Sequence, residues 1–266
     1  MTMSSSTASA LPDKMIALFV SDVHLQESMP ATTAAFLRFL QLHASQAQRL
    51  YILGDLFEYW AGDDDINTPF HRDIVNALRN LSDGGTALFW IAGNRDFLIG
   101  DDFATAIGAT RLNDASVIEV AGQAIVLAHG DAQCTDDVDY LVFRQQVRQP
   151  QWQQQFLAQP LAQRKAIIDG MRVQSRSAQL SKTEHIMDVN AQAIERLFKE
   201  SSTHLMIHGH THRPATHLSQ CDGMQHKRVV LPDWDCETAA TRRGGWIGIS
   251  NDAILSRFDV DGNLLM

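Results

Sequence analysis

Apolar runs of strand length alternate with amphipathic stretches through the first half of the chain, and further apolar runs follow near its end. Runs of about four to eight apolar residues predict strands, and apolar positions three or four apart predict helices. The predicted strands are Ile16–Val20, Leu50–Leu53, Ala87–Ala92, Val117–Val120, Ala124–Ala128, Leu205–Ile207, Arg228–Leu231, Trp246–Ser250 and Ala253–Phe258. The predicted helices are Ala31–His43 and His71–Leu81. This order indicates the α/β class, with two packed sheets flanked by helices.

The stretch from Asp136 to about Lys199 interrupts this pattern. It contains no clear strand and is rich in Gln, Arg, Leu and Ala, so we expect a helical insertion at about residues 136–190 within a domain spanning 15–266. Residues 1–14 are rich in Ser, Thr and Ala, and we expect a disordered tail there. The stretch lacks the basic start and the longer apolar run of a secretory signal.

Composition and charge narrow the classes of function. No apolar run approaches the ~20 residues that span a bilayer. Cys134, Cys221 and Cys236 are an odd and scattered set, which predicts no disulfide framework and fits a reducing cytoplasm. A net charge of −9 argues against nucleic-acid binding through a broad basic surface.

Polar side chains directly follow several of the predicted strands. The clusters are Asp22-Val-His24, Gly54-Asp55, Gly93-Asn94-Arg95-Asp96, His129-Gly130 and His208-Gly-His210-Thr-His212. Because the carboxyl ends of strands in α/β sheets converge on one crevice, these side chains can meet in the fold. A mixed set of carboxylate, imidazole and amide donors suits Mn²⁺, Fe²⁺ or Zn²⁺. The sequence therefore predicts a site for divalent metal ions.

The spacing of these residues adds to the prediction. Asp22 and His24 are two residues apart, so on an extended strand end both side chains point the same way, and His208 and His210 repeat this spacing. We expect each pair to reach a metal ion and Asp55 to bridge the two ions. DxH, GD and GN are weak alone, because such residues also occur in ordinary turns, whereas the run from His208 to His212 is stronger, because three histidines in five residues are rarely structural. The ordered set, with every member after a strand, carries the prediction.

That ordered set, DxH, GD, GN, H and GHxH, resembles the calcineurin-like metallophosphoesterase superfamily over the core from about Met15 to Phe258. The resemblance implies a sandwich of two sheets flanked by helices, with a dinuclear metal centre between loops. It implies that the first metal ion is held by Asp22, His24, Asp55 and His210. It implies that the second is held by Asp55, Asn94, His129 and His208.

A narrower resemblance runs almost the full length of the chain. The stretches Leu53–Glu58, Gly62–Asp65, Gly93–Leu98, His129–Asp131, Cys134–Asp137, Ile186–Asn190 and His208–Pro214 resemble the UDP-2,3-diacylglucosamine hydrolases, whereas Pro232–Glu237 and the N-terminal tail depart from that pattern. These enzymes are pyrophosphatases of bacterial lipid A synthesis. The resemblance implies that metal-activated water attacks the α-phosphorus to give UMP and 2,3-diacylglucosamine 1-phosphate.

The same resemblance implies the partners and the residues of the reaction. It implies two Mn²⁺ per chain, a nucleotide-activated glycolipid substrate, and a peripheral location on the cytoplasmic side of the bacterial inner membrane; we expect a monomer. The implied catalytic residues are Asp55, Asn94, Arg95 and His208. The implied substrate contacts are Asn94, Arg95, Asp137, Ser175, Gln179, Lys182 and His208.

Other interpretations of several residues stay open. Ser175 and Lys182 are also compatible with an ordinary helix surface, and Asp137 with a helix N-cap. The run from Asp63 to Asp65 favours a solvated turn over a role in steering metal. The remaining polar neighbours of the motifs are candidates for orienting the ligands: Asp96, Asp131 and His212.

Arg95 follows Asn94 at a position where many members of the superfamily carry histidine. Arginine cannot act as a general acid near neutral pH, but its planar fork binds phosphate. The leaving group should therefore need little protonation. A sugar phosphate that leaves from a phosphoanhydride meets this condition.

The predicted insertion differs in charge from the rest of the chain. Residues 144–182 carry a net charge of +6, from seven basic residues against Asp169, and they include apolar residues such as Trp152, Phe156 and Ile168. A basic and apolar helical lid is suited to cap acyl chains, hold a phosphate and contact anionic lipid. The alternative is a helical hairpin with an apolar core face and a solvated basic face.

Two other functions remain possible from the sequence. A different phosphodiesterase or a dinucleotide polyphosphate hydrolase would share the same core, but it would not need such an insertion. A binding scaffold without catalysis would be expected to have lost metal ligands, and no predicted ligand is missing from this chain.

Overall fold

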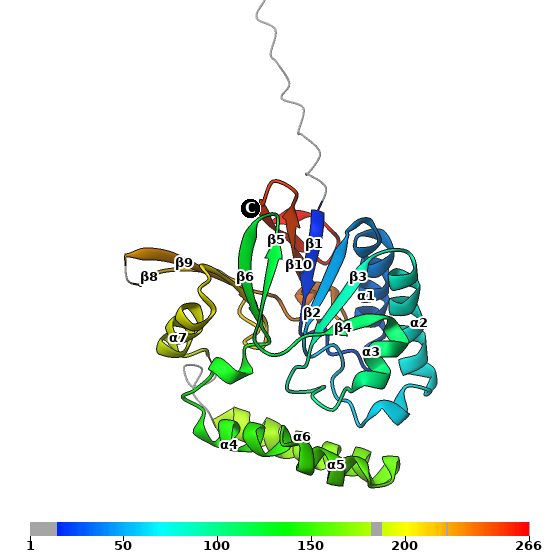
Figure 1. The fold of residues 1–266 in the computed structure, drawn as a ribbon. Helices are drawn as coiled ribbons and strands as arrows, with labels where there is room; N and C mark the ends of the chain where they lie inside the picture. Colours follow the sequence, from blue (N-terminus) through cyan, green and yellow to red (C-terminus); the bar gives the residue numbers. More distant parts are fainter. Residues whose placement is uncertain (1–14, 182–187, 222, 266) are drawn as a thin grey trace, which may run out of the picture.

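A computed structural model gives the fold, and its described residues form two β-sheets that pack face to face with helices outside them (Figure 1). The structure describes residues 15–181, 188–221 and 223–265. Over residues 173–181 it describes the helical backbone and not the side chains. The α/β class and the two-sheet arrangement predicted from the sequence are confirmed.

The first sheet has the strand order β12-β11-β10-β1-β2-β3-β4. Its strands are β1 (Met15–Val20), β2 (Arg49–Leu53), β3 (Ala87–Ile91), β4 (Ala109–Arg111), β10 (Gly245–Ser250), β11 (Leu255–Asp259) and β12 (Leu264–Leu265). Strands β1 to β4 are parallel, and β10 to β12 pair antiparallel with their neighbours. The outer face is covered by α1 (Pro30–Leu42), α2 (Pro69–Asp83) and α3 (Asp101–Ile107).

The central strands are buried on both faces, which explains their continuous apolar runs. Successive side chains of a strand point to opposite faces of the sheet. On β1, Leu18 and Val20 pack with Phe36 and Phe39 of α1, whereas Phe19 belongs to the core between the two sheets. The apolar sequence of β1 thus fills two separate cores.

The second sheet has the strand order β5-β6-β7-β9-β8, with β6, β7 and β9 parallel. Its strands are β5 (Ser116–Val120), β6 (Gln123–Ala128), β7 (Leu205–His208), β8 (Thr216–Cys221) and β9 (Met224–Val230). Helix α7 (Ala191–Ser201) packs Ile194 and Phe198 against Val126 and Met206 of this sheet.

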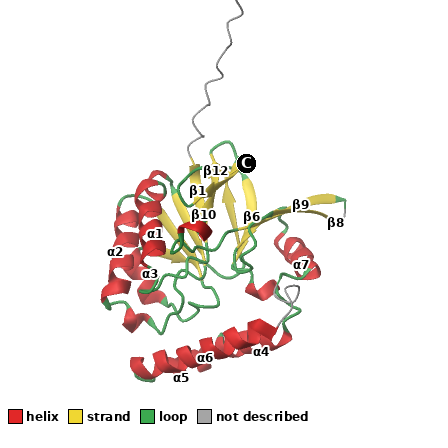
Figure 2. Ribbon diagram, turned by 180° about the vertical axis from the view of Figure 1, so that it is seen from behind, coloured by secondary structure: helices red, strands yellow, loops and turns green. Residues whose placement is uncertain are grey.

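Helices α4 (Val138–Val147), α5 (Pro150–Leu157) and α6 (Leu161–Ser181) form a layer of their own, and we call them the insertion helices. They lie beyond the end of the sheets toward which β1 and β2 run (Figures 1 and 2). Buried Phe156 of α5 joins the core of the first sheet. Among the described helices, none combines the length and the apolar character that a membrane crossing requires.

The predicted strands and helices of the first half are present, with small shifts at their ends. Strand β9 begins earlier than predicted, at Met224, because its polar half pairs with β8. Strand β8 was not predicted, since its sequence is mostly polar and its residues are largely exposed. The short helix α3 was also not predicted. The limits of the insertion at about residues 136–190 stay a prediction.

Candidate metal centre

The predicted metal ligands lie where parallel strands of both sheets end. The loops after β1, β2, β3, β6 and β7 carry, in that order, Asp22 with His24, Asp55, Asn94, His129 and His210, and His208 is the last residue of β7. Backbone hydrogen bonds join the first two loops, from Asp22 N to Gly54 O at 3.1 Å and from His24 N to Asp55 O at 3.0 Å. The strand ends therefore converge on one place.

The backbone of these loops is left-handed rather than extended. The φ angle is 52° at Asp22 and His24, 53° at Asp55 and 66° at His210. The expectation that Asp22 and His24 project from an extended strand end is therefore wrong. Positive φ at such residues costs about 1–3 kcal/mol each and persists where the surrounding structure enforces it, often at functional sites.

Glycines leave room for the carboxylates of this centre. A Cβ atom at Gly93 would overlap the Asp55 carboxylate, and one at Gly209 would overlap the Asp22 carboxylate. The backbone of both glycines therefore packs directly against a predicted ligand.

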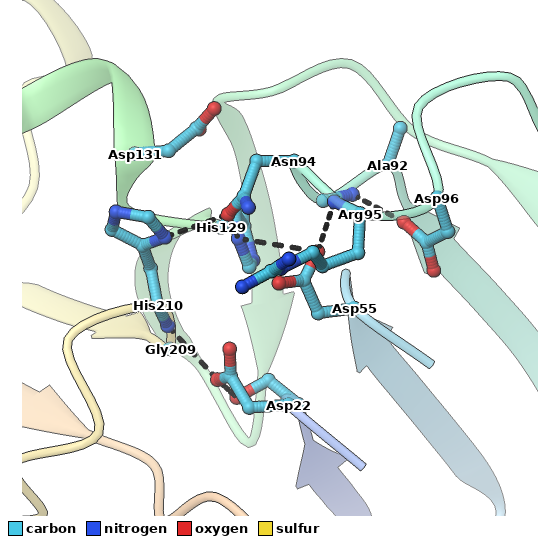
Figure 3. A network of polar contacts seen from close by, with 12 residues as sticks. Asp22, Asp55, Ala92, Asn94, Arg95, Asp96, His129, Asp131, Gly209 and His210 are labelled. Atoms are coloured by element: carbon cyan, nitrogen blue, oxygen red, sulfur yellow. Dashed lines mark hydrogen bonds and ion pairs between the residues drawn. The ribbon is translucent and has the colours of Figure 1, made fainter. Parts of the chain in front are cut away.

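Asp55, Asn94, His129 and His210 gather around a common space (Figure 3). The Oδ1 atom of Asn94 lies 2.9 Å from Nε2 of His129 and 2.7 Å from Nδ1 of His210. Nε2 of His129 is 3.6 Å from Oδ1 of Asp55. The backbone N–H of His210 donates to Oδ2 of Asp22 at 2.9 Å, which ties this group to the loop after β1.

His24 and His212 approach Asp22 as well. Nε2 of His212 is 3.4 Å from Oδ1 of Asp22 and 3.3 Å from Nε2 of His24. Asp22 thus belongs to two groups whose donor atoms lie within 4.8 Å of one another, one with His24 and His212, the other with Asp55 and His129. The sequence predicted only an orienting role for His212, so the structure adds it as a candidate ligand.

His208 makes different contacts from the other predicted ligands. Its Nε2 atom lies 3.0 Å from Nη1 of Arg228, and its Nδ1 atom lies 2.9 Å from Gly209 O. Burial and the Arg228 guanidinium lower the pKa of His208 to about 3, so the ring is neutral. In this arrangement Nε2 accepts from Arg228, and His208 belongs to neither of the two groups of candidate donors around Asp22.

The side chains present fit divalent cations. Oδ1 of Asp22 is buried and has no hydrogen-bond partner among the described residues. Burial would raise the pKa of Asp22, but His212 and the neighbouring imidazoles hold it well below its usual range, so the group is an anion. Burial and His129 lower the pKa of His210 to about 4, which keeps that ring neutral. A buried, ionised carboxylate beside neutral imidazole suits a metal ion.

The same carboxylates favour positive charge at His129. Burial alone would lower its pKa, but the charges of Asp55, Asp22 and Asp131 outweigh burial and raise it to about 9. A bound cation would satisfy these carboxylates in place of that proton, because metal ligation and protonation compete for imidazole.

Glu58 lies between the centre and two arginines. Its Oε2 atom is 3.2 Å from Nδ1 of His24, and its Oε1 atom is 2.6 Å from Nη2 of Arg172 and 4.0 Å from Nη1 of Arg95. Burial would raise the pKa of Glu58, but His24 and the two arginines lower it to about 2. Glu58 can therefore orient His24. Sequence analysis did not single it out, although it lies three residues after Asp55 in the same motif.

Asp96 holds the loop that carries Asn94. Its carboxylate accepts from the backbone N–H groups of Gly93 and Leu56, each at 2.8 Å. Burial and the charge of Asp55 raise the pKa of Asp96 to about 6. These bonds join the loops after β2 and β3, in keeping with the orienting role considered from the sequence.

The acidic run after the second strand is not a solvated turn, contrary to expectation. Asp63 accepts from the backbone N–H of Gly100 and of Phe103, both at 3.0 Å. Asp64 pairs with Arg164, and buried Asp65 lies 2.6 Å from Nζ of Lys165. The run thus joins the core to the insertion helices, through partners about a hundred residues away in the sequence.

A cavity of about 590 Å³ extends from the metal centre to the insertion helices. Its polar lining includes His24, Asp55, Glu58, Asn94, Arg95, His210 and His212, and its apolar lining includes Phe97, Leu98, Phe143, Trp152, Phe156, Ile168 and Met171. Tyr140 and Arg172, which sequence analysis did not single out, also line it.

Four of the seven predicted substrate contacts can be placed, Asn94 and His208 as described above and Arg95 and Asp137 here, and three cannot. Arg95 and Asp137 line the cavity. Asp137 is also the N-cap of α4, where its carboxylate accepts from Tyr140 N at 3.1 Å, so the N-cap interpretation is confirmed and its contact with substrate stays a prediction. Lys182 lies outside the described residues, and the side chains of Ser175 and Gln179 do as well.

An α/β sandwich whose strand ends gather carboxylate, imidazole and amide donors beside a deep cavity has the architecture of a metallophosphoesterase. Residues 15–214 match the family described as calcineurin-like phosphoesterase. The chain is 50% identical over 231 residues to UDP-2,3-diacylglucosamine hydrolase of Aromatoleum aromaticum, covering 87% of this chain and 94% of that protein. It is 43% identical over 239 residues to the enzyme of the same name from Chromohalobacter salexigens, covering 90% and 95%.

The chain therefore belongs to the calcineurin-like phosphoesterase family and, within it, to the UDP-2,3-diacylglucosamine hydrolases.

Proposed function

We propose that the protein hydrolyses the pyrophosphate bond of UDP-2,3-diacylglucosamine and releases UMP and 2,3-diacylglucosamine 1-phosphate, as a step of bacterial lipid A synthesis. The observation that carries this proposal is the cavity of about 590 Å³, which has the metal centre at one end and apolar side chains of the insertion helices at the other. A substrate with a diphosphate and two acyl chains likewise has one charged part and one apolar part. The relatives that share up to 50% identity are named for this substrate.

The residues that would hold two cations are Asp22, His24, Asp55, Asn94, His129, His208 and His210, and we propose Mn²⁺ as the cation. When bound, two such cations would neutralise charge on the phosphoryl oxygens and make water a stronger nucleophile. The mixed nitrogen and oxygen donors support a borderline divalent ion. His208 would join this set by exchanging its contact with Arg228, and His212 is a further candidate beside Asp22.

Arg95 would bind the diphosphate beside the centre. Its backbone N–H donates to Oδ1 of Asp55 at 2.8 Å, so its position is fixed relative to that carboxylate. Its guanidinium lines the cavity, and the planar fork of a guanidinium is suited to bind phosphate. Arg95 would therefore stabilise charge on the leaving sugar phosphate without protonating it. Asn94 and His208 would touch the same phosphates.

The apolar end of the cavity would hold the acyl chains. Trp152 and Phe156 stack with ring centroids 4.9 Å apart, and Phe97 approaches Trp152 at 6.2 Å. Contact of hydrocarbon with such side chains contributes about 25 cal/mol per Å² of buried apolar area. Val138 and Val142 on α4 are exposed apolar side chains, which supports a peripheral location of the protein at the cytoplasmic face of the inner membrane.

One assay tests the proposal. UMP release from UDP-2,3-diacylglucosamine in mixed micelles is measured after chelation, with and without added Mn²⁺, for the wild type and for Asp55→Ala. We expect release by the wild type with Mn²⁺ and loss of at least about 10³-fold in the variant. Phosphodiester hydrolysis without any UMP release from the glycolipid would replace this function by that of another phosphodiesterase.

A further inference from the structure

Three polar side chains spaced four residues apart point toward the core: Tyr140 and Arg144 on α4, and Arg148, the C-cap residue at the end of this helix. Residues at this spacing lie on one side of a helix. Tyr140 Oη donates to Oδ2 of buried Asp131 at 2.6 Å, and Nε of Arg144 donates to the same oxygen at 2.7 Å. Nη2 of Arg148 lies 3.7 Å from that oxygen. One buried carboxylate thus anchors this whole face of the helix.

Arg148 differs from its two neighbours because it also reaches the loop that carries Asn94 and Arg95. Its Nη2 atom donates to Gly93 O at 2.8 Å and lies 3.4 Å from Ala92 O. The Cζ atom of its guanidinium lies 5.9 Å from the centroid of the Phe97 ring. Arg148 therefore contacts the loop both before Asn94 and after Arg95.

The rest of this loop is held from the opposite side by the core. Asp96 accepts from Gly93 N, and Asp55 accepts from Arg95 N, each at 2.8 Å (Figure 3). Asp55 and Asp96 thus fix the loop toward the sheet, and Arg148 fixes it toward the insertion helices. Hydrogen bonds of a charged guanidinium to a carbonyl are among the stronger ones in proteins.

We propose that Arg148 is a positioning residue that couples the docking of α4 to the placement of Asn94 and Arg95. It touches neither substrate nor reacting atoms in this proposal. It holds the backbone that carries Asn94, a predicted metal ligand, and Arg95, the residue proposed to bind phosphate. Both side chains are therefore correctly placed only while α4 is docked on the core. The expected effect of Arg148 on kcat rests on the proposed function. The expected effect of Arg148 on the Asn94 loop rests on geometry alone.

Arg164 offers a matched comparison within the same insertion. It too is an arginine of the insertion helices that donates to a core carbonyl, Ala61 O, and pairs with a carboxylate, Asp64. Its contacts, Ala61 and Asp64, lie in the segment after β2 rather than on the loop after β3. Loss of Arg164 should loosen the insertion without releasing the Asn94 loop.

The test compares Arg148→Gln, Arg148→Lys and Arg164→Gln with the wild type. Hydrogen–deuterium exchange of the peptide covering residues 92–98, measured on metal-free protein, should rise in Arg148→Gln and stay at the wild-type level in Arg164→Gln. With Mn²⁺, kcat of Arg148→Gln should fall about ten- to a hundredfold, while KM changes less than about threefold, because misplacement by ~1 Å has effects of this size. Arg148→Lys keeps the charge but not the fork, and it should recover part of kcat.

The exchange measurement separates this proposal from the proposed function, since it needs neither metal nor substrate. Unchanged exchange of the peptide in Arg148→Gln would overturn the coupling, and so would an equal rise in Arg164→Gln. If UMP is not released by the wild type, the proposed function fails, and exchange together with hydrolysis of bis(4-nitrophenyl) phosphate still decides the role of Arg148. If Arg148→Gln does not fold, Arg148→Lys carries the same comparison.

Discussion

The metal centre and the insertion helices are held in place by different means. The side chains of the metal centre lie on loops that join buried parallel strands, and glycines pack directly against two of its carboxylates. The insertion helices contact the core through Phe156 and through charged side chains, such as Arg144 on Asp131 at one end and Lys165 on Asp65 at the other. The candidate metal ligands thus belong to the loops of the two sheets, while most of the apolar lining belongs to the layer of insertion helices.

This difference predicts a separation of functions. Changes in the metal centre should affect every phosphate substrate, because they alter the chemical step. Changes in the apolar lining of the insertion should affect only substrates with acyl chains, because they alter binding away from the reacting phosphorus. A small phosphodiester and the glycolipid together can therefore distinguish the two regions.

The largest effect is expected for Asp22→Asn. Asp22 belongs to both groups of candidate donors, and the amide removes a negative charge at nearly constant shape. We expect kcat to fall by about 10³-fold for UDP-2,3-diacylglucosamine and for bis(4-nitrophenyl) phosphate alike. Steady-state kinetics on both substrates check this, with circular dichroism as the control for folding. A loss of kcat for the glycolipid alone would contradict the proposal that the metal centre acts on every phosphate substrate.

A smaller effect is expected for Arg164→Gln, which removes the buried anchor of α6. The change leaves Ala61 O and Asp64 without this arginine, and a charged hydrogen bond contributes about 1.5–3 kcal/mol. The free energy of unfolding in urea should fall by about 2 kcal/mol. Arg79→Gln is the control, because the Arg79–Asp83 pair is exposed and should leave the urea midpoint unchanged. Equal urea midpoints for the two variants would contradict the claim that Arg164 anchors α6 to the core.

The smallest effect is expected for Trp152→Ala. This half-buried ring lines the apolar end of the cavity and stacks on Phe156. KM for the glycolipid should rise by about tenfold, as the loss of part of a buried aromatic side chain implies, with kcat for the small phosphodiester unchanged. Val142→Ala, on the exposed side of α4, serves as the matched control. An equal change in KM for both variants would contradict the proposal that this part of the cavity binds the acyl chains.

The sequence predicted the fold class, most strands and the residues that converge on the metal centre, because these signals are local. A ligand such as Asp55 or Asn94 directly follows a buried apolar run, and a glycine precedes each of them. Periodicity could not reveal the left-handed backbone at Asp22 and His24, since it depends on how the loops after β1 and β2 pack together.

The contacts of the insertion could not be predicted in the same way. Asp65 is paired with Lys165, and Glu58 with Arg172, so each partner lies far away along the chain. The run from Asp63 to Asp65 resembles a solvated turn until Arg164 and Lys165 are placed against it. Strand β8 was not predicted for another reason. Because it is an exposed edge strand, its sequence does not alternate between apolar and polar residues.

Hydrolysis in ¹⁸O-labelled water tests the central claim most directly. UDP-2,3-diacylglucosamine is turned over by the wild type with Mn²⁺, and both products are examined by mass spectrometry. Attack on the α-phosphorus predicts one ¹⁸O atom in UMP and none in 2,3-diacylglucosamine 1-phosphate. Label in the lipid phosphate, or no release of UMP, would contradict the account.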